Sequence, residues 1–232
     1  MRLAAVSNGL AKPLVPVGGK SILARSLEVL RASGIEEVTI VVGYQGALVR
    51  DTAERLWPGI GVVENDNPGA TGSMRSLALA WARLRDTPVE TVMVVEGDIL
   101  YGPEAVAALR GAAGPDTVLA SSPTGAGDEV WILGEGTRIG EISKQPVTDS
   151  EVLGELVGLC LLTRTALDRM ADTHVAGGAS TAMEQYEERI SALCPEIPFR
   201  VQVEDDLAWA EIDDPSHLAR AEAEVLPRLE GR

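Results

Sequence analysis

Apolar runs of strand length alternate with segments of helical periodicity through the first half of the chain. The runs "VTIVVG" and "TVMVVE" are continuous and rich in β-branched residues, which is typical of strands buried on both faces. Segments such as "SMRSLALAWARLR" place their apolar residues on one helical face. This alternation predicts an α/β fold with a Rossmann-like, mostly parallel central sheet flanked by helices. The expected elements of this half are strands at 38–43, 60–64 and 91–96 and helices at 21–33, 51–56 and 73–85.

The pattern changes after Tyr101, where short strand candidates follow one another with few helices between them. This change predicts a mixed sheet in the second half of the chain. No internal repeat and no low-complexity linker interrupts the sequence, so residues 1–232 are expected to form a single domain. The expected elements are strands at 117–121, 130–133, 139–143, 156–162, 199–203 and 207–212 and helices at 164–171, 180–193 and 215–229.

Composition and charge exclude several classes of partner. The 35 acidic and 20 basic residues give a formal net charge of −15, which repels a nucleic acid polymer. No apolar run approaches the ~20 residues of a membrane span, and no leader peptide opens the chain, so we expect a cytoplasmic protein without a membrane partner. The cysteines, Cys160 and Cys194, lack metal-ligand spacing and are expected to be buried thiols. The histidines, His174 and His217, are expected in loops or on helix surfaces.

Two carboxylates follow apolar strands at positions suited to a metal site. Asp98 ends "VMVVEGD", and Asp213 follows the apolar run "LAWAEI". In open α/β sheets ligands bind outside the carboxyl ends of the strands, and Mg²⁺ is usually held by one or two carboxylates together with substrate phosphates. A turn that ends a strand explains Asp98 equally well. Lys12, beside a proline, is a candidate partner for phosphate oxygens, although an isolated lysine is more often a solvated surface residue.

A family resemblance rests on motifs that span nearly the whole chain. "KPLVPVGGK" with a downstream "GD" and a terminal "EID" is the specific combination, whereas "GD" and "SK" alone are weak signals. The motifs, in family order, are "KPLVPVGGKSIL" (12–23), "GIEEVTIVVGY" (34–44), "TGSMRSLALA" (71–80), "VVEGDILY" (94–101), "EISK" (141–144), "GELVGL" (154–159) and "WAEIDDPSHL" (209–218). Together they resemble the nucleotidyltransferases of the sugar-nucleotide and phosphocholine cytidylyltransferase type.

The resemblance implies a nucleotide-diphospho-sugar transferase-like fold, with a nucleotide-binding half over about 1–101 and an acceptor-binding half over about 102–232. It also implies Mg²⁺-dependent transfer of a nucleoside monophosphate from a nucleoside triphosphate to a small phosphate or phosphonate acceptor, with release of pyrophosphate. CTP is the favoured donor, because "NPGATGSMRSLALAW" is most like the cytidylyltransferase branch. The residues implied are Arg2, Lys12, Asp98 and Asp213 for catalysis, the two aspartates as Mg²⁺ ligands, Thr71, Gly72, Ser73 and Gly97 for the nucleotide, and Lys144, Glu155 and Gly158 for the acceptor.

The family's apolar first strand and glycine-rich phosphate loop are not both found at the start of the chain. One register aligns Arg2 with the loop arginine and keeps the family's spacing to Lys12, but it lacks the strand and the glycines. It implies a start assigned ~12–15 residues too late or omitted residues, and a sheet in which two neighbouring strands are unpaired. The other register takes "LAA" (3–5) as the strand end, with a shortened loop and no arginine. We favour the first because it preserves the spacing.

Other functions are left open by the sequence. A sugar-1-phosphate nucleotidyltransferase that uses UTP, dTTP or GTP would share these motifs, and a catalytically degenerate nucleotide-binding module would fit an incomplete phosphate loop. A metal-dependent glycosyltransferase would usually show Asp-x-Asp where this chain has "EGD". The few aromatic residues argue against an aromatic cage for choline and favour a phosphonate, a phospho-amino acid, or an inositol or sugar phosphate as acceptor. A homodimer is one option for the oligomeric state.

Overall fold

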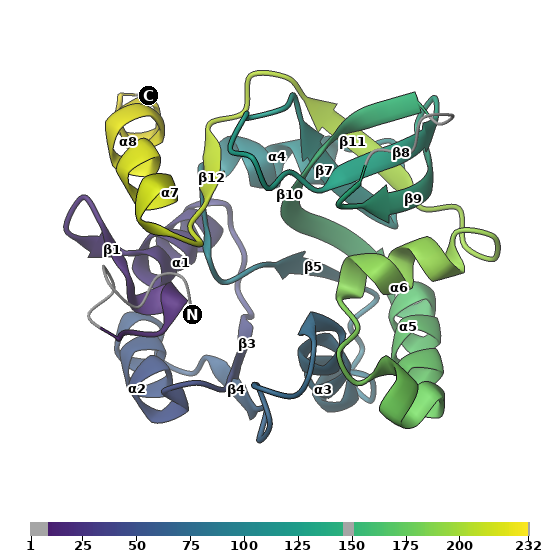
Figure 1. Cartoon of the computed structure of the whole chain (residues 1–232). Helices are drawn as coiled ribbons and strands as arrows, with labels where there is room; N and C mark the ends of the chain where they lie inside the picture. The colour runs from purple at the N-terminus through teal and green to yellow at the C-terminus, as the bar shows by residue number, and fades with distance from the viewer. Residues whose placement is uncertain (1–8, 146–150, 232) are drawn as a thin grey trace.

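The computed structural model describes residues 9–145 and 151–231. A six-stranded mixed sheet forms its centre (Figure 1). β10 runs antiparallel to both β5 and β7, and β7 is parallel to β11, so β5, β7 and β11 share one direction. The α/β class and the mixed sheet of the second half are confirmed. The strand order is β5 (Thr91–Val95), β10 (Glu151–Thr163), β7 (Thr117–Ser121), β11 (Arg200–Glu204), β9 (Arg138–Ser143) and β8 (Trp131–Glu135).

Three strand pairs lie outside this sheet. They are the parallel pair β3 (Thr39–Val42) and β4 (Gly61–Glu64), the antiparallel pair β6 (Ile99–Tyr101) and β12 (Trp209–Glu211), and the hairpin β1 (Pro16–Val17) and β2 (Lys20–Ser21). Among the described residues, β3 pairs only with β4 and β5 only with β10, so each strand has one edge without a partner strand. As a result β5, which we expected to be fully buried, is only partly buried.

Helices cover both faces of the sheet. One face packs against α1 (Ile22–Ala32), α2 (Gly46–Leu56) and α4 (Pro103–Gly111), and the other against α3 (Ser73–Leu84), α5 (Arg164–Gly177) and α6 (Tyr186–Leu193). Successive side chains of a strand point to opposite faces. In β7, therefore, Val118 and Ala120 belong to the core beside α3, α5 and α6, whereas Leu119 belongs to the core beside α1, α2 and α4.

Local signals place the helix ends. The side chain of Ser21 accepts a hydrogen bond from the amide of Ala24 (3.2 Å) and caps α1, which ends just before Gly34 at φ +73°. The C-terminal helix runs through α7 (Pro215–Arg220), a π-helical turn at Ala221–Val225 and α8 (Leu226–Glu230). Pro227 has no N–H for the α-helical bond to residue 223, which accounts for the irregular turn before it. None of the described helices has the length and apolarity needed to cross a membrane.

Two expectations for helices were wrong. α4 was not expected, although Gly102-Pro103 is a helix start and the buried Ala105 and Leu109 recur at helical spacing. The single helix expected over 180–193 is instead a 3₁₀ turn at Gly178–Thr181 and, after a break, α6. The chain between them, residues 182–185, docks on the N-terminus of α3 and is called the docking loop below.

Gly72 makes the closest contact with the docking loop. Its amide donates to the carbonyl oxygen of Ala182 (2.9 Å), and the amide of Met74 donates to that of Glu184 (3.2 Å). A Cβ on Gly72 would overlap the carbonyl oxygen of Glu184. Two orphan amides at the start of α3 thereby gain acceptors, and α3 is fixed to the second half of the chain.

Gly72→Ala is expected to lower the free energy of unfolding by about 1–3 kcal/mol, because the added methyl group forces the docking loop away from α3. Gly69→Ala is the matched control, since a Cβ at Gly69 meets no atom within 4 Å. Urea unfolding of both variants and the wild type measures the difference. Equal stability of the two variants would contradict the close packing described here.

Candidate active site

The turn after β5 and the end of β12 bring the candidate carboxylates together. Asp98 lies in the turn between β5 and β6, and Asp213 lies just beyond β12. β6 and β12 pair with Ile99 opposite Glu211, and the amide of Ile212 donates to the carbonyl oxygen of Asp98 (2.9 Å). This pairing places residues far apart in the sequence next to each other.

Lys12 joins the two aspartates. Its ammonium nitrogen, Nζ, donates to Oδ2 of Asp98 at 2.8 Å and also to Oδ1 of Asp213. Burial lowers the pKa of Lys12, but the charges and hydrogen bonds of Asp98 and Asp213 outweigh it, so the pKa is raised overall. The structure therefore brings three of the residues named from the sequence to one point.

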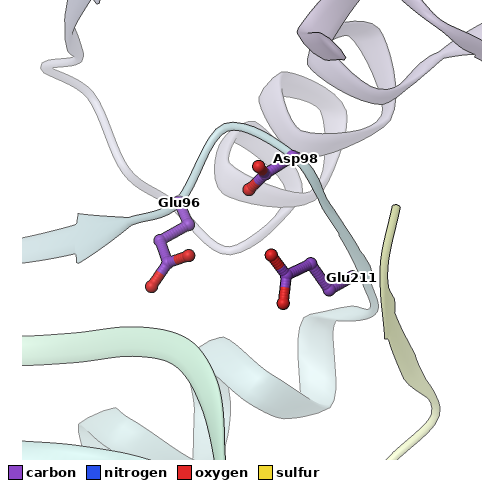
Figure 2. A group of neighbouring side chains, drawn as sticks. All are labelled: Glu96, Asp98 and Glu211. Carbon is purple, nitrogen blue, oxygen red and sulfur yellow. The ribbon is translucent and has the colours of Figure 1, made fainter. Parts of the chain in front are cut away.

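Two further carboxylates, Glu96 and Glu211, lie beside Asp98. One carboxylate oxygen from each of the three lies within 4.8 Å of the other two. Figure 2 shows them around one space, with Glu96 at the end of β5, Asp98 in the turn and Glu211 on β12. Burial, followed by repulsion from Asp98, raises the pKa of Glu96 to about 7 and that of Glu211 to about 8. The hydroxyl of Tyr186 donates to Oε1 of Glu96 (2.6 Å) and partly opposes that rise.

The chemistry of these carboxylates fits a hard divalent cation. Mg²⁺ prefers oxygen ligands and is commonly bound through one or two carboxylates. Burial, followed by repulsion from neighbouring carboxylates, raises the pKa of Glu96 and of Glu211, and a cation placed among these carboxylates would relieve both effects. Within the described part of the chain, no other group of three His, Cys, Asp or Glu side chains lies close enough to share an ion.

A cavity adjoins Glu211. It is small and partly open to solvent, and its lining includes Thr124, Asp128, Glu155, Trp209, Glu211 and Arg220. Oε2 of Glu155 accepts from the amide of Thr124 (2.5 Å) and Oε1 accepts from its hydroxyl (3.0 Å), while burial raises the pKa of Glu155. Glu155, expected to contact the acceptor, is thus fixed in the wall of a cavity beside the carboxylates.

Gly158 and Lys144, the other two expected acceptor contacts, have different surroundings. The carbonyl oxygen of Gly158 accepts from the amide of Glu96 (3.0 Å), and a Cβ at Gly158, where φ is +88°, would lie 3.1 Å from Cδ of Glu96. Glycine there leaves room for the Glu96 side chain. Lys144 is exposed beyond the end of β9 and does not line the cavity. Burial raises the pKa of Glu187 on α6, and the charge of Lys144 partly offsets that rise.

The expected nucleotide contacts at 71–73 have partners within the protein. The hydroxyl of Thr71 donates to the carbonyl oxygen of Asn67 (2.8 Å), and the amide of Ser73 donates to Oε1 of Gln185 (3.2 Å). The amide of Gly72 is held by the docking loop. Three polar groups at the start of α3 are therefore engaged in holding the loops around it.

Gln45, the residue before α2, holds the segment that carries Lys12. The side-chain amide of Gln45 donates to the carbonyl oxygen of Gly9 (2.8 Å), and its Oε1 accepts from the amide of Ala11 (2.8 Å). Gln45 has φ +52°, a conformation that a non-glycine residue keeps only where its surroundings hold it there. Gly97 also lies next to this segment, since a Cβ there would lie 3.4 Å from Cγ of Pro13.

The expectations for both histidines were wrong, because both side chains are buried. Nδ1 of His174 lies 3.0 Å from Oε2 of Glu184, and Nδ1 of His217 accepts from the amide of Asp213 (3.4 Å). Glu184 lies ten residues after His174, beyond the end of α5, whereas Asp213 lies four residues before His217, just ahead of α7. His217 steadies the backbone of a candidate metal ligand.

Sequence reasoning named Asp98 and Asp213 but not Glu96 and Glu211. A signal was present, because both strand ends carry the same pattern, Glu-x-Asp, in "EGD" and "EID". Arg2, the fourth residue proposed for catalysis, lies outside the described residues, as do the positions up to 8 on which both registers for the start of the chain depend.

Stability without divalent cations should fall as the pH rises through the range set by Glu211. Its folded pKa, about 8, exceeds its ordinary 4.5, so between these values the folded state holds a proton that the unfolded state has lost. Glu211→Gln should flatten this dependence by on the order of 1 kcal/mol, since solvent screens a partly exposed group. Urea unfolding in EDTA at pH 5 and pH 8 tests this. Glu135→Gln, an exposed change on β8, is the control, and equal slopes in the two variants would contradict the burial described for Glu211.

Comparisons with known proteins identify the family of the chain. The family model for the MobA-like NTP transferase domain matches residues 4–194. The chain is 29% identical to CMP-5'-(3-aminopropyl)phosphonate synthase of Streptomyces rubellomurinus and 32% identical to the bifunctional IPC transferase and DIPP synthase of Rubrobacter xylanophilus, over 99% and 94% of its length. These matches cover 38% and 48% of the two proteins, so the chain spans less than half of either.

Solved structures share the fold. CTP:phosphocholine cytidylyltransferase from Streptococcus pneumoniae has a TM-score of 0.72 and 18% identity, over 96% of this chain and 92% of that one. The inositol-1-phosphate CTP transferase from T. maritima has a TM-score of 0.74 and 18% identity, over 97% and 92%. The expected nucleotide-diphospho-sugar transferase-like fold is thereby confirmed. Because the family match covers most of the sequence, the chain belongs to the family of MobA-like NTP transferase domains.

Proposed function

We propose that the chain is an Mg²⁺-dependent nucleotidyltransferase that moves CMP from CTP to a small phosphate or phosphonate acceptor and releases pyrophosphate. The observation that carries this proposal is the meeting of Lys12, Asp98 and Asp213 at the end of β5, beside the cavity that Glu155 lines. Membership of an NTP transferase family supports a nucleoside triphosphate as donor.

The names of similar proteins support CTP and a small phosphorus oxyanion as the two substrates. One relative is named for CMP joined to an aminopropylphosphonate, and two structural neighbours are named for CTP with phosphocholine and with inositol 1-phosphate. We infer that about 1–101 bind the nucleotide and about 102–232 the acceptor. Since the chain spans less than half of its curated relatives, the proposal concerns this transfer reaction alone.

The proposed reaction needs no protein nucleophile. An oxygen of the acceptor, already ionised at neutral pH, attacks the α-phosphorus of CTP as the bond to the bridging oxygen of pyrophosphate breaks. Lys12 neutralises the triphosphate, and Glu155 contacts the acceptor in the cavity. Asp98 and Asp213 would hold Mg²⁺, which supplies neutralisation of phosphate oxygens when bound. The chain's part is therefore to position the two substrates and balance their charge.

Asp98→Asn and Asp213→Asn should each lower the rate of pyrophosphate release by about a hundredfold or more, because each removes a charge that holds the reacting phosphates through the metal. The assay combines the purified chain with Mg²⁺, each of four nucleoside triphosphates, and a panel of phosphonates, inositol phosphates, phosphocholine and sugar phosphates. Wild-type turnover should be fastest with CTP.

Asp51→Asn, an exposed change on α2, is the matched control and should retain the wild-type rate. Turnover only with UTP, dTTP or GTP and sugar 1-phosphates would replace CMP transfer by a sugar-1-phosphate nucleotidyltransferase reaction. Nucleotide binding without any turnover, unaffected by either aspartate change, would contradict the proposed reaction and favour a binding module.

A further inference from the structure

Lys12 contacts both aspartates that the proposed function assigns to the divalent cation. Its ammonium contacts Asp98 and Asp213, and its charge also acts on Glu96 and Glu211. Among the residues that the structure describes, no other cation forms an ion pair with these four carboxylates. The lysine is thus the resident positive charge of the whole group.

The ammonium and a metal cannot share these oxygens without strong repulsion. Lys12 takes up Oδ2 of Asp98 and Oδ1 of Asp213, one oxygen of each proposed metal ligand. Two cations on the same pair of carboxylates would lie within a few ångströms of each other, where like charges oppose one another strongly. Entry of a metal therefore requires the lysine side chain to move.

The surroundings of Lys12 allow its side chain to move while its backbone stays in place. The Gln45 side chain holds Ala11, and the amide of Leu14 donates to the carbonyl oxygen of Ala11 (2.8 Å). Ala11 and Leu14 are both buried, so the segment is anchored on each side of the lysine. The Lys12 side chain is 40% exposed, and its ammonium group lies at the end of a flexible stem. It is free to swing away from the aspartates.

We propose that Lys12 is a tethered counter-ion that competes with the divalent cation for Asp98 and Asp213, and that a nucleoside triphosphate releases it by offering phosphate oxygens instead. This rests on the proposed function, because it requires a triphosphate at this site. Ammonium groups form strong charge-assisted hydrogen bonds with phosphate. Metal and nucleotide then bind cooperatively, each strengthening the other by the same factor.

Titration of the protein with Mn²⁺, followed by electron paramagnetic resonance of the free ion, tests the competition directly. Without nucleotide, Lys12→Met should bind Mn²⁺ about tenfold more tightly than the wild type, an effect within the usual range of coupling between sites. A residue that merely held the aspartates in place would have the opposite effect, because its loss would weaken metal binding. Lys12→Gln provides the same test should the methionine variant not fold.

Two control variants separate charge from structure. Lys12→Arg keeps a cation at the position and should bind Mn²⁺ as weakly as the wild type. Lys20→Met makes the same change in net charge at an exposed lysine, paired with Glu28 at 2.7 Å, and should also leave Mn²⁺ binding unchanged. Thermal unfolding confirms that each variant is folded before titration.

A nonhydrolysable CTP analogue completes the test, after correction for Mn²⁺ bound by free analogue. The analogue should tighten Mn²⁺ binding by a larger factor in the wild type than in Lys12→Met. Wild-type or weaker Mn²⁺ affinity in Lys12→Met without nucleotide would overturn the proposal, as would equally tight binding by Lys12→Arg. Because Mn²⁺ binding requires no turnover, failure of the proposed reaction would be seen separately in the pyrophosphate assay.

Discussion

Four carboxylates meet beside the end of β5, and the repulsion among them is the constraint around which the neighbouring elements are arranged. Lys12 relieves part of it by bonding to Asp98, 86 positions away, and to Asp213, 201 positions away. One charge therefore links three segments that are distant in the sequence. Loss of the contact would leave two half-buried aspartates facing each other, so the lysine segment is part of the structure of the site as well as of its chemistry.

The backbone around the carboxylates is held by hydrogen bonds from several elements. β6 and β12 pair over three residues, and Ile212 continues the pairing to Asp98. His217 accepts a hydrogen bond from the amide of Asp213. Gln45, whose own φ is positive, holds the segment that carries Lys12. A backbone held in this way keeps reacting groups in place, while on the proposal above the Lys12 side chain moves when a charged ligand binds. On the proposal that Lys12 is displaced, the site combines a hydrogen-bonded backbone with one movable cation.

The α/β class, most strands and the helices with caps were predictable, because burial on a sheet imposes hydrophobic patterns that survive in the sequence. The interruption of the expected helix between residues 181 and 186 was not predictable. It depends on contact with α3, a tertiary interaction that overrides local helical preference. Asp98 and Asp213 were predictable from their places at strand ends. The contact of both aspartates with the ammonium of Lys12 was not predictable, because no local sequence pattern shows which distant side chain will supply the opposite charge.

The net charge of −15 opposes the binding of two phosphorylated substrates, and the proposed metal would offset this charge at the site. The cavity next to Glu211 is itself lined by carboxylates, with Arg220 as a positive exception. A negatively charged site repels phosphates until a divalent cation offsets its charge. The cation held by the carboxylates at the end of β5 would then draw the acceptor and the nucleotide to one place, as in-line transfer requires. On this view the acidic cluster makes substrate binding conditional on the metal, which keeps the triphosphate from occupying the site in an unreactive form.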